Sequence, residues 1–169
     1  MCKRLPVTSV SCAGYPGTLT LRVTTATPEQ IAAKSPLDFV TANDWVLIKA
    51  GAQQMKFSAG DAIIRQDSPG GTMFILRSGS VRVQAGGTTL ARLGPGQICG
   101  EIAFLDNRPS SASVIAEAHV EADAIDWADL QRVFRMFPHL GSRFYQSLAV
   151  LLSRRLRETS ARLAECQQG

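Results

Sequence analysis

A segment near the middle of the chain combines glycine, carboxylate and hydroxyl side chains in a pattern that suits a small anionic ligand. Gly100 and Glu101 open the segment, and Arg108, Ser110 and Ser111 close it. Glycine allows a ligand to approach the backbone closely, and a carboxylate accepts hydrogen bonds from ligand hydroxyls. Residues 101–105 also predict one helical turn whose free N–H groups face an anion.

Each of these residues has a simpler interpretation that the sequence leaves open. Glu101 is also able to cap local backbone N–H groups in a pocket that binds nothing. Arg108 suits a solvated loop, and Cys99 suits a small buried position in a strand.

Catalytic and metal chemistry find little support in the chain. No C-x-x-C spacing occurs, no Ser/His/Asp or Cys/His arrangement stands out, and the glycines match neither P-loop nor dinucleotide fingerprints. We therefore expect no enzyme activity, no cofactor, no metal and no disulfide framework. The residues considered for metal binding are Cys2, Cys12, Cys99, Cys166, His119 and His139.

The segment interrupts a series of short strands. Between Met55 and Ile125, apolar runs alternate with Gly, Pro and Ser turns, and Gly86-Gly87 is a strong hairpin signal. About eight short strands of this kind favour a sandwich or closed barrel over a parallel sheet. The runs that we expect as strands are 55–57, 62–65, 72–77, 81–83, 88–93, 113–116 and 120–125.

Helices are expected on both sides of the strands. Before them, Thr27 is a candidate N-cap for one helix, and a second helix begins near Thr41 and ends near Gly51. After them, Asp126 caps a helix that reaches Phe137, and Pro138 separates it from a longer one.

The longer C-terminal helix carries an apolar stripe from Leu140 to Leu163. This stripe packs on the strands or pairs with a second copy in a homodimer. Arg143, Arg154 and Arg157 fall on the opposite face. Arg155 and Arg162 fall on the apolar side, where we expect them to snorkel to water.

The central segment resembles the phosphate-binding cassette of the cyclic-nucleotide-binding domain family, which includes the catabolite activators and the regulatory subunits of protein kinase A. The family pattern Gly-Glu-apolar-Ala, five residues and Pro is met by residues 100–109 without a gap, and Gly60-Asp61, Gly70 and Gly94-Pro95-Gly96 agree upstream. The resemblance implies a mainly β fold, a double-stranded β-helix (jelly-roll) barrel with flanking helices. It implies these ligand-binding positions: Gly100, Glu101, Ile102, Ala103, Arg108, Ser110, Ser111 and Ala112.

By the family pattern, Glu101 and the Gly100 N–H hold the ribose 2′-hydroxyl, while the Ala103 and Ser111 N–H groups meet the cyclic phosphate. Ser110 stands where the family has its phosphate-binding arginine. Loss of a hydrogen bond to a charged group weakens binding about 10- to 100-fold. Arg108, two residues earlier, is the candidate to replace it.

We therefore expect an irregular arm over residues 1–27 and a cyclic-nucleotide-binding-like domain over 28–165, with its barrel at about 54–126 and C-terminal helices at about 127–166. The expected function is a regulatory domain that binds cAMP, cGMP or a related anion and relays this through the C-terminal helix. The alternative is a degenerate domain that has lost nucleotide binding and serves as a protein-interaction module.

The remaining expectations concern partners and location. The net charge of +4 is mild, and no direct binding to nucleic acid is expected. No stretch approaches the roughly 20 apolar residues of a membrane span, and no export signal is apparent. These features predict a cytoplasmic protein without a membrane partner.

Overall fold

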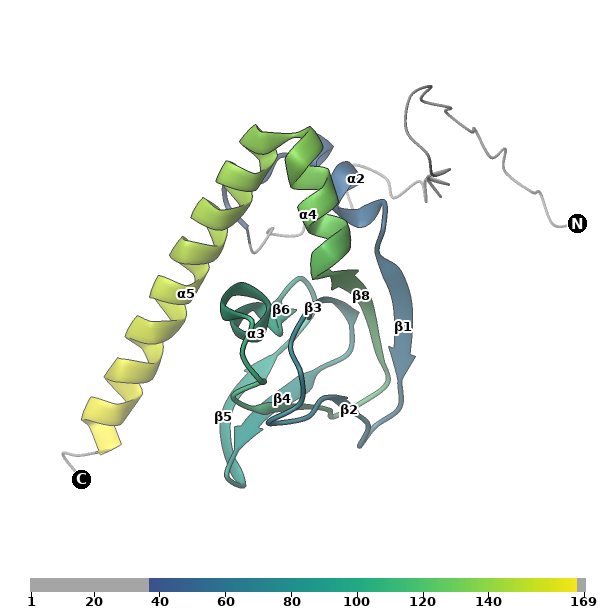
Figure 1. Ribbon diagram of the computed structural model, residues 1–169. Coiled ribbons are helices and arrows are strands. Elements are labelled where there is room, and N and C mark those ends of the chain that lie inside the picture. Colours follow the sequence, from purple (N-terminus) through teal and green to yellow (C-terminus); the bar gives the residue numbers. More distant parts are fainter. Residues whose placement is uncertain (1–36, 167–169) are drawn as a thin grey trace, which may run out of the picture.

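The computed structural model describes residues 37–166, and the side chains as far as Ala164. These residues form two four-stranded antiparallel sheets flanked by helices (Figure 1). The strands are β1 Gln53–Phe57, β2 Ala62–Ile64, β3 Thr72–Ser78, β4 Val81–Ala85, β5 Thr88–Leu93, β6 Ile98–Cys99, β7 Ser113–Ala116 and β8 Val120–Asp126. The helices are α2 Ala42–Lys49, α3 Glu101–Asp106, α4 Trp127–Met136 and α5 Pro138–Cys166. The expected N-terminal arm and the helix expected from Thr27 lie outside the described residues.

The mainly β architecture with flanking helices is confirmed, but the expected closed barrel is wrong. One sheet has the order β1-β8-β3-β6 and the other β2-β7-β4-β5, and no ladder joins them. Closure requires edge strands that pair with one another. Here the chain leaves β1 through a tight turn, in which the Asp61 N–H donates to the Ser58 carbonyl (3.0 Å), and enters the other sheet as β2. The sheets therefore meet through side chains.

Both faces of β3 are buried because an apolar core lies on each side of its sheet. The core between the sheets contains Phe74 and Leu76, together with the β4 residue Val81. The opposite face contributes Met73 and Ile75 to a second core, which the helices cover. This alternation follows from the two-residue period of a strand. The helical members of the second core are Trp45, Ile48, Phe104, Leu130, Leu140, Phe144 and Leu148.

The predicted helix boundaries agree closely with the described ones. Thr41 caps α2 in a capping box with Asp44, and the Asp126 carboxylate accepts from the Ala128 N–H (2.8 Å) at the start of α4. Helix α4 is capped at Phe137, and α5 begins at Pro138. None of the helices in residues 37–166 has the length and apolar character needed to cross a membrane.

Helix α5 is joined to the segment that precedes β1. Arg143 donates from Nε and Nη2 to the two carboxylate oxygens of buried Asp44, at 2.9 and 2.6 Å. Two further contacts join the same segment to α5. Asp38 pairs with Arg154, and the Phe39 N–H donates to Ser147 Oγ. Arg143 and Arg154, which were expected on the face opposite the apolar stripe, therefore bind this segment.

Candidate functional site

Gly100 positions the start of α3 beside β3. Its φ is +82°, a left-handed conformation that side-chain-bearing residues rarely adopt. A Cβ added here would lie 2.7 Å from the Thr72 carbonyl oxygen. Glycine is thus required both by the backbone conformation and by the close approach of β3, and it lets α3 begin immediately after β6.

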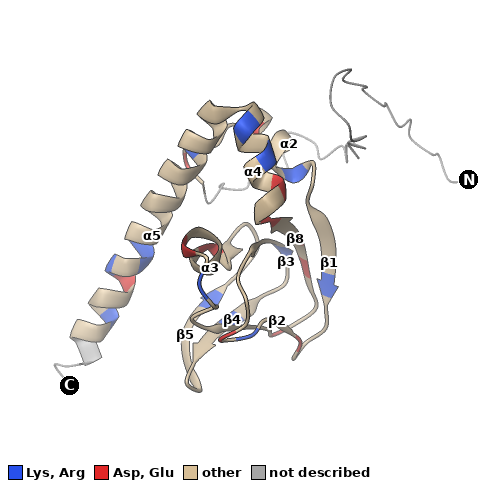
Figure 2. Cartoon of the chain, in the orientation of Figure 1, with Lys and Arg blue, Asp and Glu red and all other residues tan. Residues whose placement is uncertain are grey.

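Glu101, the first residue of α3, is buried and bound to α5. Only 3% of its surface is exposed. Arg155 donates from Nη1 to Glu101 Oε1 and from Nη2 to the Ile98 carbonyl oxygen, the latter at 2.6 Å. Figure 2 shows the acidic residues of α3 and the basic residues in the C-terminal half of α5. One guanidinium therefore links α5 both to α3 and to β6.

The loop after α3 is held against the loop between β2 and β3. The Ser110 N–H donates to the Ser68 carbonyl (2.9 Å), and the Asp67 N–H donates to the Ser110 carbonyl (2.8 Å). The Gln66 N–H donates to Ser113 Oγ (2.9 Å). These bonds fix the backbone of Ser110, although they leave its hydroxyl without a hydrogen bond among the described residues.

Gly70 brings the same two loops into close contact. A Cβ at this position would lie 2.7 Å from the Ala103 carbonyl oxygen and 2.9 Å from that of Arg108. Contacts this short to backbone atoms leave no room for a side chain. The β2–β3 loop and the loop after α3 thus form one packed unit.

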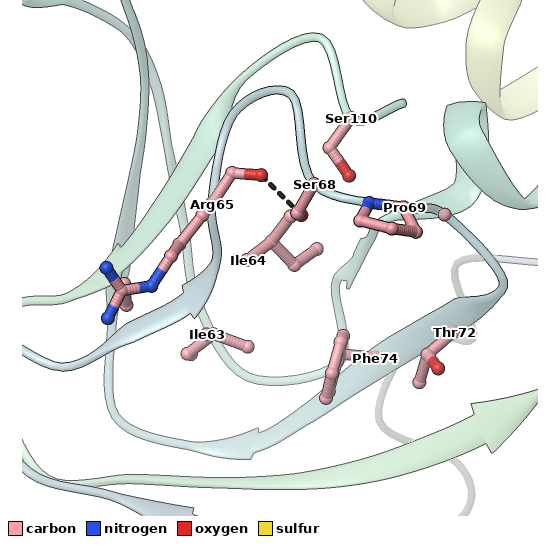
Figure 3. Close-up of a pocket in the computed structure, with 10 residues that line it drawn as sticks. Ile63, Ile64, Arg65, Ser68, Pro69, Thr72, Phe74 and Ser110 are labelled. Atoms are coloured by element: carbon pink, nitrogen blue, oxygen red, sulfur yellow. Dashed lines mark hydrogen bonds between the residues drawn. The ribbon is translucent and has the colours of Figure 1, made fainter. Parts of the chain in front are cut away.

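A cavity of about 310 Å³ lies beside this unit (Figure 3). Its volume is at the lower end of the range for small-molecule sites. Ser110 reaches it from the loop after α3, and its hydroxyl points toward the Ser68–Pro69 segment. The wall is partly apolar and partly polar, with hydroxyls at Ser68, Thr72 and Ser110. The lining residues are Ala62, Ile63, Ile64, Arg65, Ser68, Pro69, Gly70, Thr72, Phe74 and Ser110.

The structure places one of the predicted site residues, Ser110, on this cavity, and the others around it. Glu101 and Ala103 are buried, whereas Ile102 is 48% exposed. Arg108 and Ser111 are exposed, Ala112 is half-buried, and Gly100 lies behind Ile64 at the start of α3. The eight residues therefore surround the packed loops but do not converge on one hollow.

The structure confirms the prediction that Cys99 is a buried strand residue. It is 2% exposed in β6, and burial raises the pKa of its thiol from 9.0 to about 12. A thiol with this pKa stays protonated near neutral pH and is a poor nucleophile. Within residues 37–166, no group of three or more His, Cys, Asp and Glu residues is placed to hold a metal ion.

Comparison with known proteins identifies the family of the domain. Residues 54–136 match the family model for the cyclic nucleotide-binding domain. This part of the chain belongs to the cyclic nucleotide-binding domain family. The match includes β2 and β3, the residues of α3 and the loop that carries Ser110.

Relatives of this cyclic nucleotide-binding domain occur in proteins of different kinds. The Cyclic AMP receptor protein of Thermus thermophilus is 35% identical over 116 residues, which are 66% of this chain and 52% of the relative. The crystal structure of the Thermus thermophilus Catabolite Activator Protein aligns with a TM-score of 0.65 and 32% identity, over 79% of this chain and 63% of that one. Glutaminase 2 of Bradyrhizobium diazoefficiens is 33% identical over 63% of this chain and 17% of the relative.

These coverages limit what the relatives imply. The chain spans about half the length of the Thermus relative and less than a fifth of the glutaminase. The shared part is the domain, and one of the proteins that carry it is named as an enzyme.

Sequence reasoning missed two parts of the site. The cavity wall from β2 to the start of β3 was not foreseen, because it forms only when Ser110 folds back on Ser68. Arg155 was expected to snorkel to water, and this is wrong: its guanidinium is bound to Glu101 and Ile98. The sequence feature that could have indicated this contact is the position of Arg155 on the apolar side of the helix.

Proposed function

We propose that this domain is a regulatory module that binds a cyclic nucleotide, cAMP or cGMP, or a related small anion beside Ser110, and relays binding through α5. The family match supports the ligand class. The cavity supports the location, since apolar walls suit a base or sugar and the hydroxyl of Ser110 is free to donate. In this role the domain binds and does not catalyse.

The contact of Arg155 with Glu101 carries the proposal. By the resemblance, Glu101 is the acceptor for a ribose hydroxyl, yet here it is buried and bound to α5. A ligand hydroxyl that takes the Oε1 oxygen of this carboxylate must displace Arg155 and with it the neighbouring part of α5. Ligand therefore has different affinities for the two positions of α5, which is the condition for a relay.

The end of α4 gives α5 a place to pivot. Phe137 has φ −130° and ψ +74°, outside the helical region, and Pro138 begins the next helix. A short break of this kind absorbs rotation while each helix stays intact. Movement at Arg155 is thus compatible with a fixed α4.

Calorimetric titration of cAMP and cGMP tests the proposal with four proteins: the natural chain, Glu101→Ala, Arg155→Gln and Ser110→Arg. Binding by the natural chain that is lost in Glu101→Ala supports it, and Arg155→Gln should bind several times more tightly because Glu101 is then open. Binding that appears only in Ser110→Arg would instead favour the degenerate domain.

We also propose that α5 pairs with α5 of a second copy. Leu156 and Leu163 are 68% and 59% exposed and lie seven residues apart on one face of the helix. Such spacing suits a coiled-coil seam. Sedimentation of the natural chain beside the Leu156→Glu variant tests this pairing. A natural chain that sediments as a dimer, with a variant that sediments as a monomer, supports it. A natural chain that is itself a monomer contradicts it.

A further inference from the structure

The cavity contains one charged side chain among its ten lining residues, and that residue is Arg65. This inference depends on the proposed function, because it concerns how an anionic ligand is held at that site. A phosphodiester carries a negative charge, and a charge moved out of water needs a partner. Ser110 offers a hydroxyl, which does not replace a guanidinium. The charge must therefore be met from elsewhere on the wall.

The other arginines nearby are poorly placed for this task. Arg108 is exposed and is not part of the wall, and its backbone N–H donates to Asp106 Oδ1 at 3.1 Å. Arg155 is already committed to Glu101 and the Ile98 carbonyl. Arg155 cannot reach an anion beside Ser110 without breaking its contacts, and Arg108 would have to enter the cavity from outside its wall.

Arg65 is anchored at its backbone and free at its tip. Its carbonyl oxygen accepts from the Ser68 hydroxyl (2.6 Å) and from the Ser68 N–H (3.2 Å). Its side chain is exposed, and its guanidinium makes no ion pair or hydrogen bond with any residue of the described part. An arginine with these properties can change rotamer without loss of a contact.

The same segment places Arg65 across the cavity from Ser110. Ser68, which binds the Arg65 carbonyl, also accepts from the Ser110 N–H. In Figure 3 the Arg65 guanidinium points away from Ser110, so a rotamer change is needed to bring it over Ile64. The long arginine side chain permits this movement while its Cα stays in place.

We propose that Arg65, and not Arg108, supplies the cation that binds the phosphate of the ligand in this cavity. The cation comes from the end of β2, and Ser110 donates a hydroxyl from the opposite side. The apolar wall that includes Ile63 and Phe74 then faces the uncharged part of the ligand. The ligand class is a phosphate ester with one apolar face.

The test compares cAMP with adenosine, which lacks the phosphate. Affinities of both are measured by calorimetry for the natural chain, Arg65→Gln, Arg65→Lys and the matched variant Arg108→Gln. Loss of a charge-assisted contact should weaken cAMP binding by Arg65→Gln about 10- to 100-fold. The adenosine affinity should stay unchanged, Arg65→Lys should recover part of the loss, and Arg108→Gln should bind as the natural chain does.

The outcomes separate this inference from the proposed function. If the natural chain binds cAMP and Arg65→Gln binds it equally well, Arg65 is not the anchor, while the binding function stands. Loss in Arg108→Gln in place of Arg65→Gln would assign the role to the loop after α3. If Arg65→Gln lowers the affinity for cAMP and for adenosine equally, the substitution acts on the structure, and the proposed contact with the phosphate is overturned. A natural chain that binds neither cAMP nor cGMP would overturn both proposals.

Discussion

Arg155 is the residue whose loss should reveal the most about α5. Without its guanidinium, the buried Glu101 carboxylate and the Ile98 carbonyl lose a charged donor. We expect Arg155→Gln to lower the free energy of unfolding by about 1.5–3 kcal/mol, measured by urea denaturation. Arg162→Gln is the matched control, since exposed Arg162 binds only the Leu90 carbonyl among the residues that the structure describes, and its effect should stay within about 0.5 kcal/mol. Equal effects of the two variants would contradict this.

Asp44 gives the fold a dependence on acid pH. The Arg143 guanidinium lowers the pKa of Asp44 from its ordinary 3.8 to about 2, against the opposing effect of burial. A carboxyl with a depressed pKa in the folded state stabilises the fold above its unfolded pKa, and this contribution is lost as pH falls through the folded value. The stabilisation should therefore be complete above about pH 4 and disappear toward about pH 2.

Urea denaturation of the natural chain and Asp44→Asn across this range measures that effect. The natural chain should be the more stable at about pH 6, and the difference should shrink as the pH approaches about 2. Asp38→Asn is a useful comparison, because Asp38 pairs with Arg154 at the exposed surface. A stability difference for Asp44→Asn that is independent of pH would contradict the assignment.

At the scale of elements, the contact between α3 and the β2–β3 loop depends on Gly70. In Gly70→Ala the new Cβ would meet the Ala103 and Arg108 carbonyls below 3.0 Å. We expect a loss of about 1–3 kcal/mol in unfolding free energy, with weaker ligand binding because Ser110 moves. Gly94→Ala is the control, since no atom lies within 4 Å of its added Cβ and its φ is unstrained. A Gly70→Ala variant as stable as Gly94→Ala would contradict the packing.

The elements also show how far sequence patterns reach. β5 and β7 have their predicted bounds, because alternation and glycine turns are local signals. The Gly86-Gly87 hairpin was equally local, and both glycines have positive φ. The two-residue strand β6 is too short to show a period, so no strand run was predicted there, although Cys99 was expected to lie in a strand.

Contacts between distant residues were beyond sequence reasoning. Arg155 and Glu101 are 54 positions apart, and nothing in helical periodicity selects that pair. The cavity wall likewise depends on the bonds between Ser110 and Ser68. The cassette was recognisable from its residues, whereas its closure by α5 required the tertiary structure.

At the scale of the whole molecule, three sites connect ligand, cassette and C-terminal helix. The cavity lies beside Ser110, Glu101 begins the cassette helix, and Arg155 joins that helix to α5. A second set of contacts, led by Arg143 with Asp44, holds the first turns of α5 to the segment before β1. A shift of α5 at Arg155 must therefore break these contacts, and the pair of Arg154 with Asp38, or carry them along.

Hydrogen exchange of the whole chain, with and without saturating cAMP, tests ligand sensing most directly. The account predicts slower exchange at residues 62–72 and 100–112, which surround the cavity, together with altered exchange in α5 beyond Leu151 and little change in α4. Protection around the cavity with no change in α5 would contradict the relay. Exchange that cAMP leaves unaltered throughout the chain would contradict the sensing of cAMP.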